Sequence, residues 1–270
     1  MIIYVIMSLF ATSIKTTVGN ELNKVNLYND NNYKEILKDN VGSPYQLAID
    51  YDTNVLFFSY SLNENYMKFY SGCINLKSKE FEIIKGIKGG FAQTVDRQTK
   101  TVYLGGADGV YRFDYKTKTA KHINVTTQSI WQMFFKNNLY YTSYPEEHVY
   151  VYKDGQSQRV PQLLGTKGML VAIDNADNIY FSNSSGLHVY EKNIGVIQFL
   201  GDYILNGITS DINGNLFFST PNEVFSINSE NKTIKKLFTM DDIYGIAVES
   251  DGKIIYGSEN GIIRLKPRKL

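Results

Sequence analysis

The sequence contains few of the residues on which much protein chemistry depends. Its 270 residues include one cysteine, three histidines, one tryptophan and five prolines. A single cysteine, Cys73, excludes an intrachain disulfide framework and a cysteine-based zinc site, and we expect it to be a small buried residue on a strand. The formal net charge of +1 creates no field that would attract nucleic acid or an anionic membrane, so we expect neither as a partner.

A long apolar run occurs at the N-terminus, where residues 2–11 read IIYVIMSLFA before a polar stretch. A ten-residue helix rises about 15 Å, half the thickness of a bilayer core, so this run is too short to span a membrane. We predict a signal peptide over residues 1–19, cleaved after Ser13 or after Gly19, and a single domain over residues 20–270. The alternative is a buried first strand. Three N-x-S/T sequons of a secreted chain are candidate glycosylation sites: Asn124, Asn183 and Asn231.

Internal repeats dominate the rest of the chain. Six copies of one pattern, an apolar strand, a polar turn and a strand rich in Leu, Phe and Tyr, include YQLAIDYDTNVLFFSY and MLVAIDNADNIYFSN. The first strand of each copy ends at one of six marker positions, spaced by 46, 40, 38, 37 and 38 residues: Asp50, Asp96, Lys136, Asp174, Asp211 and Glu249. A period near 40 residues indicates about four short strands per unit. We therefore predict an all-β, six-bladed β-propeller with about four antiparallel strands per blade.

The last repeat ends one strand short, at GIIRLKPRKL. Residues 32–39 (NYKEILKD) have the pattern of a fourth strand, so we predict that an N-terminal strand completes the last blade and closes the ring. Adjacent aromatics such as Phe57 and Phe58 fit this architecture. Successive strand residues point to opposite faces, and neighbouring blades cover both faces.

The repeated acidic markers resemble the paired carboxylates that general acid–base catalysis requires. Each of them precedes a turn, however, and aspartate readily accepts hydrogen bonds from the backbone of its own turn. Ring geometry also distributes Asp50, Asp96, Asp174 and Asp211 around the disc instead of bringing them together. We therefore predict that they are scaffold residues.

The opposite end of each innermost strand is a candidate ligand site. The residues five positions before the markers are mostly aromatic, and repeat equivalence predicts that they surround one mouth of the central channel. An apolar concavity with a few amides is typical of a small-molecule site, and aromatic rings favour a flat, conjugated ligand. The same rings could equally plug the channel. The candidate ligand-binding residues are Tyr45, Gln46, Phe91, Gln93, Trp131, Gln132, Met169, Asn206 and Tyr244.

Catalytic motifs are missing from the sequence. It contains no G-x-S-x-G elbow, no P-loop and no H-E-x-x-H motif. The three histidines, His122, His148 and His188, are isolated from one another, and we expect each to be a strand or loop surface residue. The sequence therefore predicts no catalytic residue, no metal site and no cofactor.

One stretch, NGITSDINGNLFFS from Asn206, resembles the repeat of six-bladed propellers in the gluconolactonase and senescence-marker-protein superfamily. For the metal-dependent lactonases, this resemblance implies a cation-binding Glu before Gly-Pro in the first inner strand, where this chain has Val41-Gly42-Ser43-Pro44. Asn206 is kept, but Tyr244 stands where the resemblance implies a catalytic Asp. One oxygen ligand does not hold a hard cation, which takes six or more. A metal-dependent lactonase-like hydrolase with a rearranged site is the alternative function, and a protein-interaction propeller with a broad apolar patch is a third.

Over nearly the whole chain after the leader, the sequence resembles the ommochrome-binding protein family, which comprises pigment carriers of lepidopteran haemolymph. The most specific stretches lie at residues 43–61, 89–117 and 244–267. The resemblance implies a secreted insect protein that binds an ommochrome-type aromatic pigment, or a tryptophan-derived precursor, and catalyses nothing. It implies no particular contact residues. We place the pigment at the mouth of the channel and expect a monomer.

Overall fold

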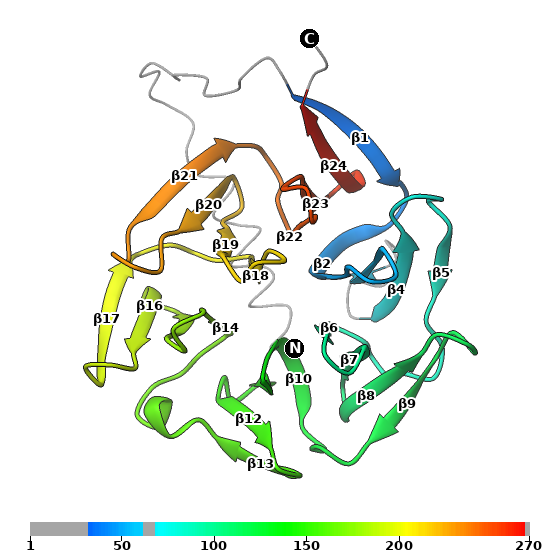
Figure 1. Cartoon of the computed structure of the whole chain (residues 1–270). Coiled ribbons are helices and arrows are strands. Elements are labelled where there is room, and N and C mark those ends of the chain that lie inside the picture. Colours follow the sequence, from blue (N-terminus) through cyan, green and yellow to red (C-terminus); the bar gives the residue numbers. More distant parts are fainter. Residues whose placement is uncertain (1–31, 62–67, 268–270) are drawn as a thin grey trace.

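The chain forms a six-bladed β-propeller, which confirms the fold prediction (Figure 1). The structure is a computed structural model that describes residues 32–61 and 68–267. The proposed signal peptide at residues 1–19 and the start of the predicted domain lie outside the described residues. Within the described ranges the only helical element is a short 3₁₀ turn at Pro161–Leu163, and no helix there is long and apolar enough to cross a membrane.

In each of the first three blades the chain runs from the innermost strand outward through antiparallel neighbours. Blade 1 consists of β2 (Gly42–Asp50), β3 (Val55–Ser61), β4 (Phe69–Asn75) and β5 (Phe81–Ile83). Blade 2 consists of β6 (Ala92–Asp96), β7 (Thr101–Gly106), β8 (Gly109–Asp114) and β9 (Thr119–Ile123). Blade 3 consists of β10 (Ser129–Lys136), β11 (Asn138–Tyr144), β12 (Val149–Lys153) and β13 (Gln156–Arg159).

The next two blades repeat this order, and the sixth departs from it. Blade 4 consists of β14 (Leu170–Ile173), β15 (Ile179–Asn183), β16 (Gly186–Glu191) and β17 (Val196–Gly201). Blade 5 consists of β18 (Gly207–Ser210), β19 (Leu216–Ser219), β20 (Glu223–Ile227) and β21 (Ile234–Thr239). Blade 6 consists of β22 (Gly245–Val248), β23 (Ile254–Ser258), β24 (Gly261–Pro267) and β1 (Asn32–Lys38).

The N-terminal strand closes the ring, as predicted from the missing strand of the last repeat. β1 pairs antiparallel with β24, and Glu35 lies opposite Arg264 in the register. Figure 1 shows β1 along the outer edge of blade 6, next to the β4–β5 side of blade 1. The two ends of the described chain therefore hold each other in one sheet, and the blade has no missing outer strand.

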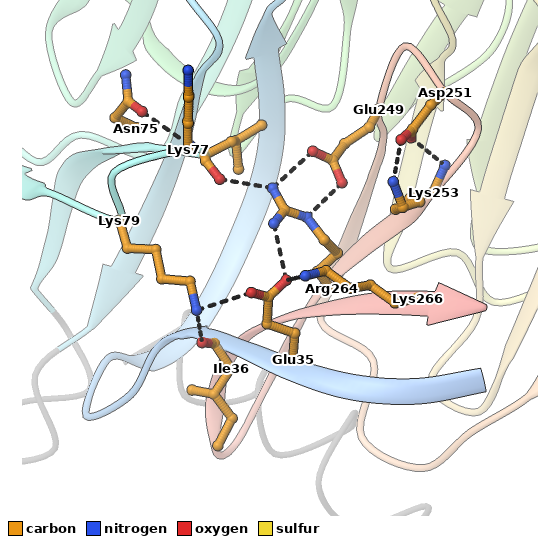
Figure 2. A network of polar contacts seen from close by, with 11 residues as sticks. Glu35, Ile36, Asn75, Lys77, Lys79, Glu249, Asp251, Lys253, Arg264 and Lys266 are labelled. Atoms are coloured by element: carbon orange, nitrogen blue, oxygen red, sulfur yellow. Dashed lines mark hydrogen bonds and ion pairs between the residues drawn. The ribbon is translucent and has the colours of Figure 1, made fainter. Parts of the chain in front are cut away.

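A buried arginine joins the three chain segments that meet at this closure (Figure 2). The Arg264 guanidinium donates two hydrogen bonds to the Glu249 carboxylate, at 2.6 and 2.8 Å, in a bidentate arrangement. It also donates to Glu35 Oε2 on β1 at 3.0 Å and to the Leu76 carbonyl of blade 1 at 2.9 Å. Arg264 is only 8% exposed. Since a buried cation is tolerated only when it is paired, the closing strand and the buried charge depend on each other.

Glu35 is the carboxylate through which this network holds β1. Its oxygens lie 2.6 Å from Lys266 Nζ and 2.9 Å from Lys79 Nζ, in addition to the contact with Arg264. Burial alone raises the pKa of Glu35, but the hydrogen bonds from Lys266, Lys79 and Arg264 outweigh it and lower the pKa to about 2. Because this pKa is below the usual value, the interaction stabilises the fold fully above about pH 4.5 and is lost as the pH falls towards 2.

Adjacent aromatics of the second strands pack on opposite faces of their blades. Phe57 lies in the cluster between blades 1 and 2, whereas its neighbour Phe58 lies in the cluster between blades 1 and 6. Cys73 is in the same cluster as Phe57, on β4, which confirms that it is a buried strand residue. Burial raises the pKa of its thiol to about 11. These apolar clusters pack each blade against its neighbours on both faces.

Candidate functional site

Five aromatic rings form a continuous row at the mouth of the channel where the innermost strands begin. The ring centroids of Tyr45 lie 5.2 Å from Tyr244 and 5.9 Å from Phe91. Phe91 stacks on Trp131 at 4.5 Å, and Trp131 stacks on Tyr144 at 5.5 Å. A sixth ring, Phe69, meets Phe91 edge-on at 4.6 Å. We call these six side chains the aromatic layer, and this end of the channel the aromatic mouth.

Four of the candidate site residues therefore lie together, as repeat equivalence predicted. Phe91 is buried between its neighbours, whereas Tyr45, Trp131 and Tyr244 are partly exposed and form the accessible surface of the layer. Burial raises the pKa of Tyr45 well above its usual range, and the neighbouring Tyr244 raises it further. The Tyr45 hydroxyl therefore stays neutral and can donate a hydrogen bond at physiological pH.

Two members of the aromatic layer were not predicted, Phe69 and Tyr144. Phe69 begins β4 and Tyr144 ends β11. Antiparallel pairing brings the end of a second strand back to the start of the first, and Tyr144 accordingly lies opposite Ser129. The signal that could have found Tyr144 is the tyrosine at the end of the third repeat copy, read with this pairing rule.

The candidate amides mainly join neighbouring blades. Gln132 of blade 3 donates to the Val171 carbonyl of blade 4 at 3.1 Å and to its own neighbour Met133 O at 3.0 Å, and its Oε1 accepts from Val171 N at 3.0 Å. Asn206 donates to the Ile243 carbonyl, between blades 5 and 6, at 2.6 Å. Both side-chain amides are thus committed to holding the inner strands together.

Gln93 differs from Gln132 in the hydrogen bonding of its side-chain oxygen. Its Nε2 donates to the backbone carbonyls of Tyr45, at 3.2 Å, and of Gln46 in blade 1. Gln46 has a positive φ of 51° at an irregularity of β2, which turns its carbonyl out of the strand ladder. Gln93 Oε1, in contrast, accepts no hydrogen bond from any residue in the described ranges, although the side chain is only 4% exposed.

A cavity of about 270 Å³ fills the channel behind the aromatic layer. Its wall includes Gln46, Gln93 and Gln132 at one end and Tyr51, Arg97 and Lys136 at the other, but none of the six aromatic-layer residues. The cavity therefore begins one residue inside the aromatic mouth and reaches the turns at the opposite face, where we call the opening the turn mouth. Met169, also a candidate, is partly exposed and does not line this cavity.

The repeated aspartates at the turn mouth are scaffold residues, as predicted. Asp174 accepts hydrogen bonds from Ala176 N, Asn178 N and Asn178 Nδ2, each at 2.9 Å, and is fully buried. Asp50 and Asp96 likewise bind the turns that follow them. These carboxylates are engaged by their own turns, and Asp50 also accepts a hydrogen bond from the Tyr115 hydroxyl of blade 2, so they do not form a catalytic pair.

The structure shows where the residues compared with the metal-dependent lactonase pattern lie. The stretch at residues 41–44 begins β2 at the aromatic mouth, Asn206 binds a backbone carbonyl, and Tyr244 lies in the aromatic layer. In residues 32–61 and 68–267 no group of three or more His, Cys, Asp or Glu side chains could hold a metal ion. Two histidines bind local backbone carbonyls, His122 at Asp108 and His188 at Gly186.

Exposed apolar surface is concentrated at the rim of the ring. Five of the eight large apolar side chains exposed in the described part of the chain lie on or beside β17: Ile194, Val196, Ile197, Phe199 and Ile204. β17 is the outermost strand of blade 4 (Figure 1). The exposed strip and the channel are therefore separate features of the molecule.

Solved structures with a similar fold place the chain in a class. A gluconolactonase from Xanthomonas campestris superposes with a TM-score of 0.66 over 87% of this chain and 89% of that one, at 13% identity. A streptogramin B lyase superposes with a TM-score of 0.57 over 88% of this chain and 99% of that one, also at 13% identity. At such identities the likeness concerns the fold alone. The chain is thus a six-bladed propeller with gluconolactonase-like structural neighbours.

A sequence relative identifies the family. The chain is 39% identical over 247 residues to the ommochrome-binding protein of Manduca sexta, a match that covers 89% of this chain and 90% of that protein. No protein-family profile matches the sequence. The chain belongs to the ommochrome-binding protein family, as the sequence resemblance predicted.

Proposed function

We propose that the protein is a secreted, non-enzymatic carrier that binds an ommochrome-type pigment, or a tryptophan-derived precursor, at the aromatic mouth. The observation that carries this proposal is the 39% identity, over nearly the full length of both chains, to a protein named for ommochrome binding. The aromatic layer supports it, because a row of partly exposed rings is a surface on which a flat conjugated molecule stacks.

The energetics of such a site are sufficient for a carrier. Stacking against the exposed rings of Tyr45, Trp131 and Tyr244 contributes roughly 0.5–1.5 kcal/mol per pair beyond the burial of area. Burial of about 300 Å² of apolar ligand surface adds roughly 7 kcal/mol before the loss of ligand motion is subtracted. Affinity in the micromolar range or somewhat better follows from these terms. Met169 and Asn206 occupy the remaining repeat positions around the mouth.

Secretion belongs to the same proposal. The N-terminal apolar run supports a signal peptide, and the sequons support glycosylation. Asn124 and Asn231 are exposed, and Asn183 ends β15 in front of a tight turn. A shift in mass after treatment with a glycosidase, together with N-terminal sequencing of protein secreted by insect cells, would test both features.

Pigment binding is tested directly by titration of the purified protein with xanthommatin. Trp131 is the only tryptophan of the chain and lies in the aromatic layer, so its fluorescence reports on the proposed site. We expect saturable quenching and a shifted pigment absorption band, with a Kd in the micromolar range or below. Unchanged fluorescence together with an unchanged pigment spectrum would contradict the proposal.

The gluconolactonase-like neighbours favour one alternative, a metal-dependent lactonase-like hydrolase. Lactone hydrolysis should be measured after removal of metals and after addition of Ca²⁺ or Zn²⁺. As a carrier, the protein should show no metal-stimulated turnover, while pigment binding should be the same in both preparations. Metal-stimulated turnover would support the hydrolase instead.

A further inference from the structure

The turn mouth of the channel presents two cations that face no carboxylate partner. Arg97 follows β6, Lys136 ends β10, and both line the cavity. Within residues 32–61 and 68–267 neither forms an ion pair; instead Arg97 Nη1 donates to the Ile212 carbonyl at 2.9 Å. Lys136 Nζ donates to Asp174 O at 2.5 Å and to Asn175 Oδ1 at 3.0 Å. Each cation therefore bonds neutral acceptors and has no carboxylate within ion-pair distance among the described residues.

Arg97 lies across the opening. It extends from blade 2 to the β18–β19 turn of blade 5, and its guanidinium carbon lies 5.2 Å from the ring centroid of Tyr51 in blade 1. The Tyr51 hydroxyl in turn donates to the Val248 carbonyl of blade 6 at 2.7 Å. A guanidinium has five N–H donors, and this contact with Ile212 uses one of them. The exposed Arg97 side chain can therefore bind an anion at the mouth without leaving its position.

A single acidic side chain, Asp211, lines the same cavity. Its carboxylate accepts hydrogen bonds from Asn213 N at 2.8 Å, Asn215 N at 2.9 Å and Asn215 Nδ2 at 2.8 Å. Because these donors saturate it, Asp211 serves its own turn as the other aspartates do. The charged side chains of the cavity wall thus comprise two cations and one carboxylate whose oxygens are already hydrogen-bonded.

The wall of the cavity combines polar and apolar groups, and one of its buried polar atoms has no partner among the described residues. Ile49, Met133, Ile208 and Ile246 contribute to its wall, and Gln93 does so with a carbonyl oxygen that no described residue engages. Gln93 and Arg97 are four residues apart on an extended segment, or about 13 Å. At about 270 Å³ the cavity lies just below the usual range for drug-sized ligands, so it admits only a small ligand.

We propose that the channel is a second ligand site, separate from the aromatic layer, which takes a slender organic acid through the turn mouth. The carboxylate lies between Arg97 and Lys136, the apolar body follows the channel, and an N–H group at the far end donates to Gln93 Oε1. Carboxylate recognition by a guanidinium is strong because the hydrogen bonds are charge-assisted. This site does not depend on pigment binding, since no aromatic-layer residue lines the cavity.

Calorimetric titration with indolebutyrate and with its neutral carboxamide tests the proposal. This pair keeps a flat body and an N–H donor, and it replaces the terminal carboxylate by an uncharged amide. We expect the acid to bind at least tenfold more tightly than the amide. Arg97→Gln should weaken the acid tenfold or more and change the amide less than twofold, and Lys136→Gln should act in the same direction. Gln93→Leu should weaken both probes equally.

Arg112→Gln is the matched control, because Arg112 is an exposed arginine on β8 of the same blade and does not line the cavity. It should bind both probes as the parent protein does. Equal affinities for acid and amide, equal effects of Arg97→Gln and Arg112→Gln, or no binding of the acid at millimolar concentration would each overturn the proposal. Xanthommatin titration of the same samples separates this result from the carrier function: acid binding without pigment binding refutes only the carrier function, and the reverse refutes only the channel site.

Discussion

The two mouths of the channel are built from equivalent positions of the same six repeats, yet they differ in chemistry. At the aromatic mouth, side chains of different blades contact each other, ring on ring, from Tyr244 through Tyr45 and Phe91 to Trp131. At the turn mouth, the repeated aspartates mainly bind their own turns, and contacts between blades come from individual residues such as Arg97 and Tyr115. A repeated residue can therefore form a shared surface only where its local backbone does not already satisfy it.

The largest expected effect is a loss of stability of the whole ring, on which both mouths depend. Arg264→Ala leaves the Glu249 and Glu35 carboxylates without their buried partner and detaches β1 from the closure. We expect a loss of about 3–5 kcal/mol in the free energy of unfolding, measured by urea denaturation. Lys236→Ala is the control, because its ion pair with Glu223 is exposed and should be worth less than about 1 kcal/mol. Similar losses in the two variants would show that the ring does not depend on the Arg264 network.

A smaller effect distinguishes the two glutamines behind the aromatic mouth. Gln132→Leu removes three hydrogen bonds and leaves both backbone groups of the buried Val171 without that partner, so we expect a loss of about 2–3 kcal/mol in unfolding free energy. Gln93→Leu removes donors to two carbonyls only and should cost about 1 kcal/mol. If thermal or urea unfolding gave equal losses of free energy for the two variants, the two amides would contribute equally to stability.

The smallest expected effect concerns ligand affinity alone. Trp131→Ala should weaken xanthommatin binding about tenfold, or about 1.4 kcal/mol, because it removes a central stacking ring. Indolebutyrate binding in the channel should change less than twofold. Phe199→Ala, which removes an exposed ring from the rim of blade 4, is the control and should leave both affinities unchanged. Normal pigment binding by Trp131→Ala would identify the aromatic layer as a plug.

The repeats made it possible to predict, from the sequence, at which height along the propeller axis many residues lie. Tyr45, Phe91, Trp131 and Tyr244 could be placed at one mouth because equivalent residues of a propeller lie at the same height around its axis. The turn role of the aspartates followed from their chemistry. The commitment of Gln132 to Val171 was not predictable in this way, since it depends on how closely two particular blades approach. Phe69 and Tyr144 were missed because strand pairing, not sequence distance, places them.

The sequence by itself determined the number of blades, the strand that closes the ring and the family, because these depend on periodic patterns and long stretches of identity. Only the tertiary structure decided which polar groups remain free for a ligand. Asp174 and Gln132 looked available in sequence but are satisfied by neighbours, whereas Gln93 Oε1 and the cations of the turn mouth are not paired among the described residues. The physical reason is that a hydrogen bond or an ion pair depends on distances between blades, which a repeat pattern does not contain.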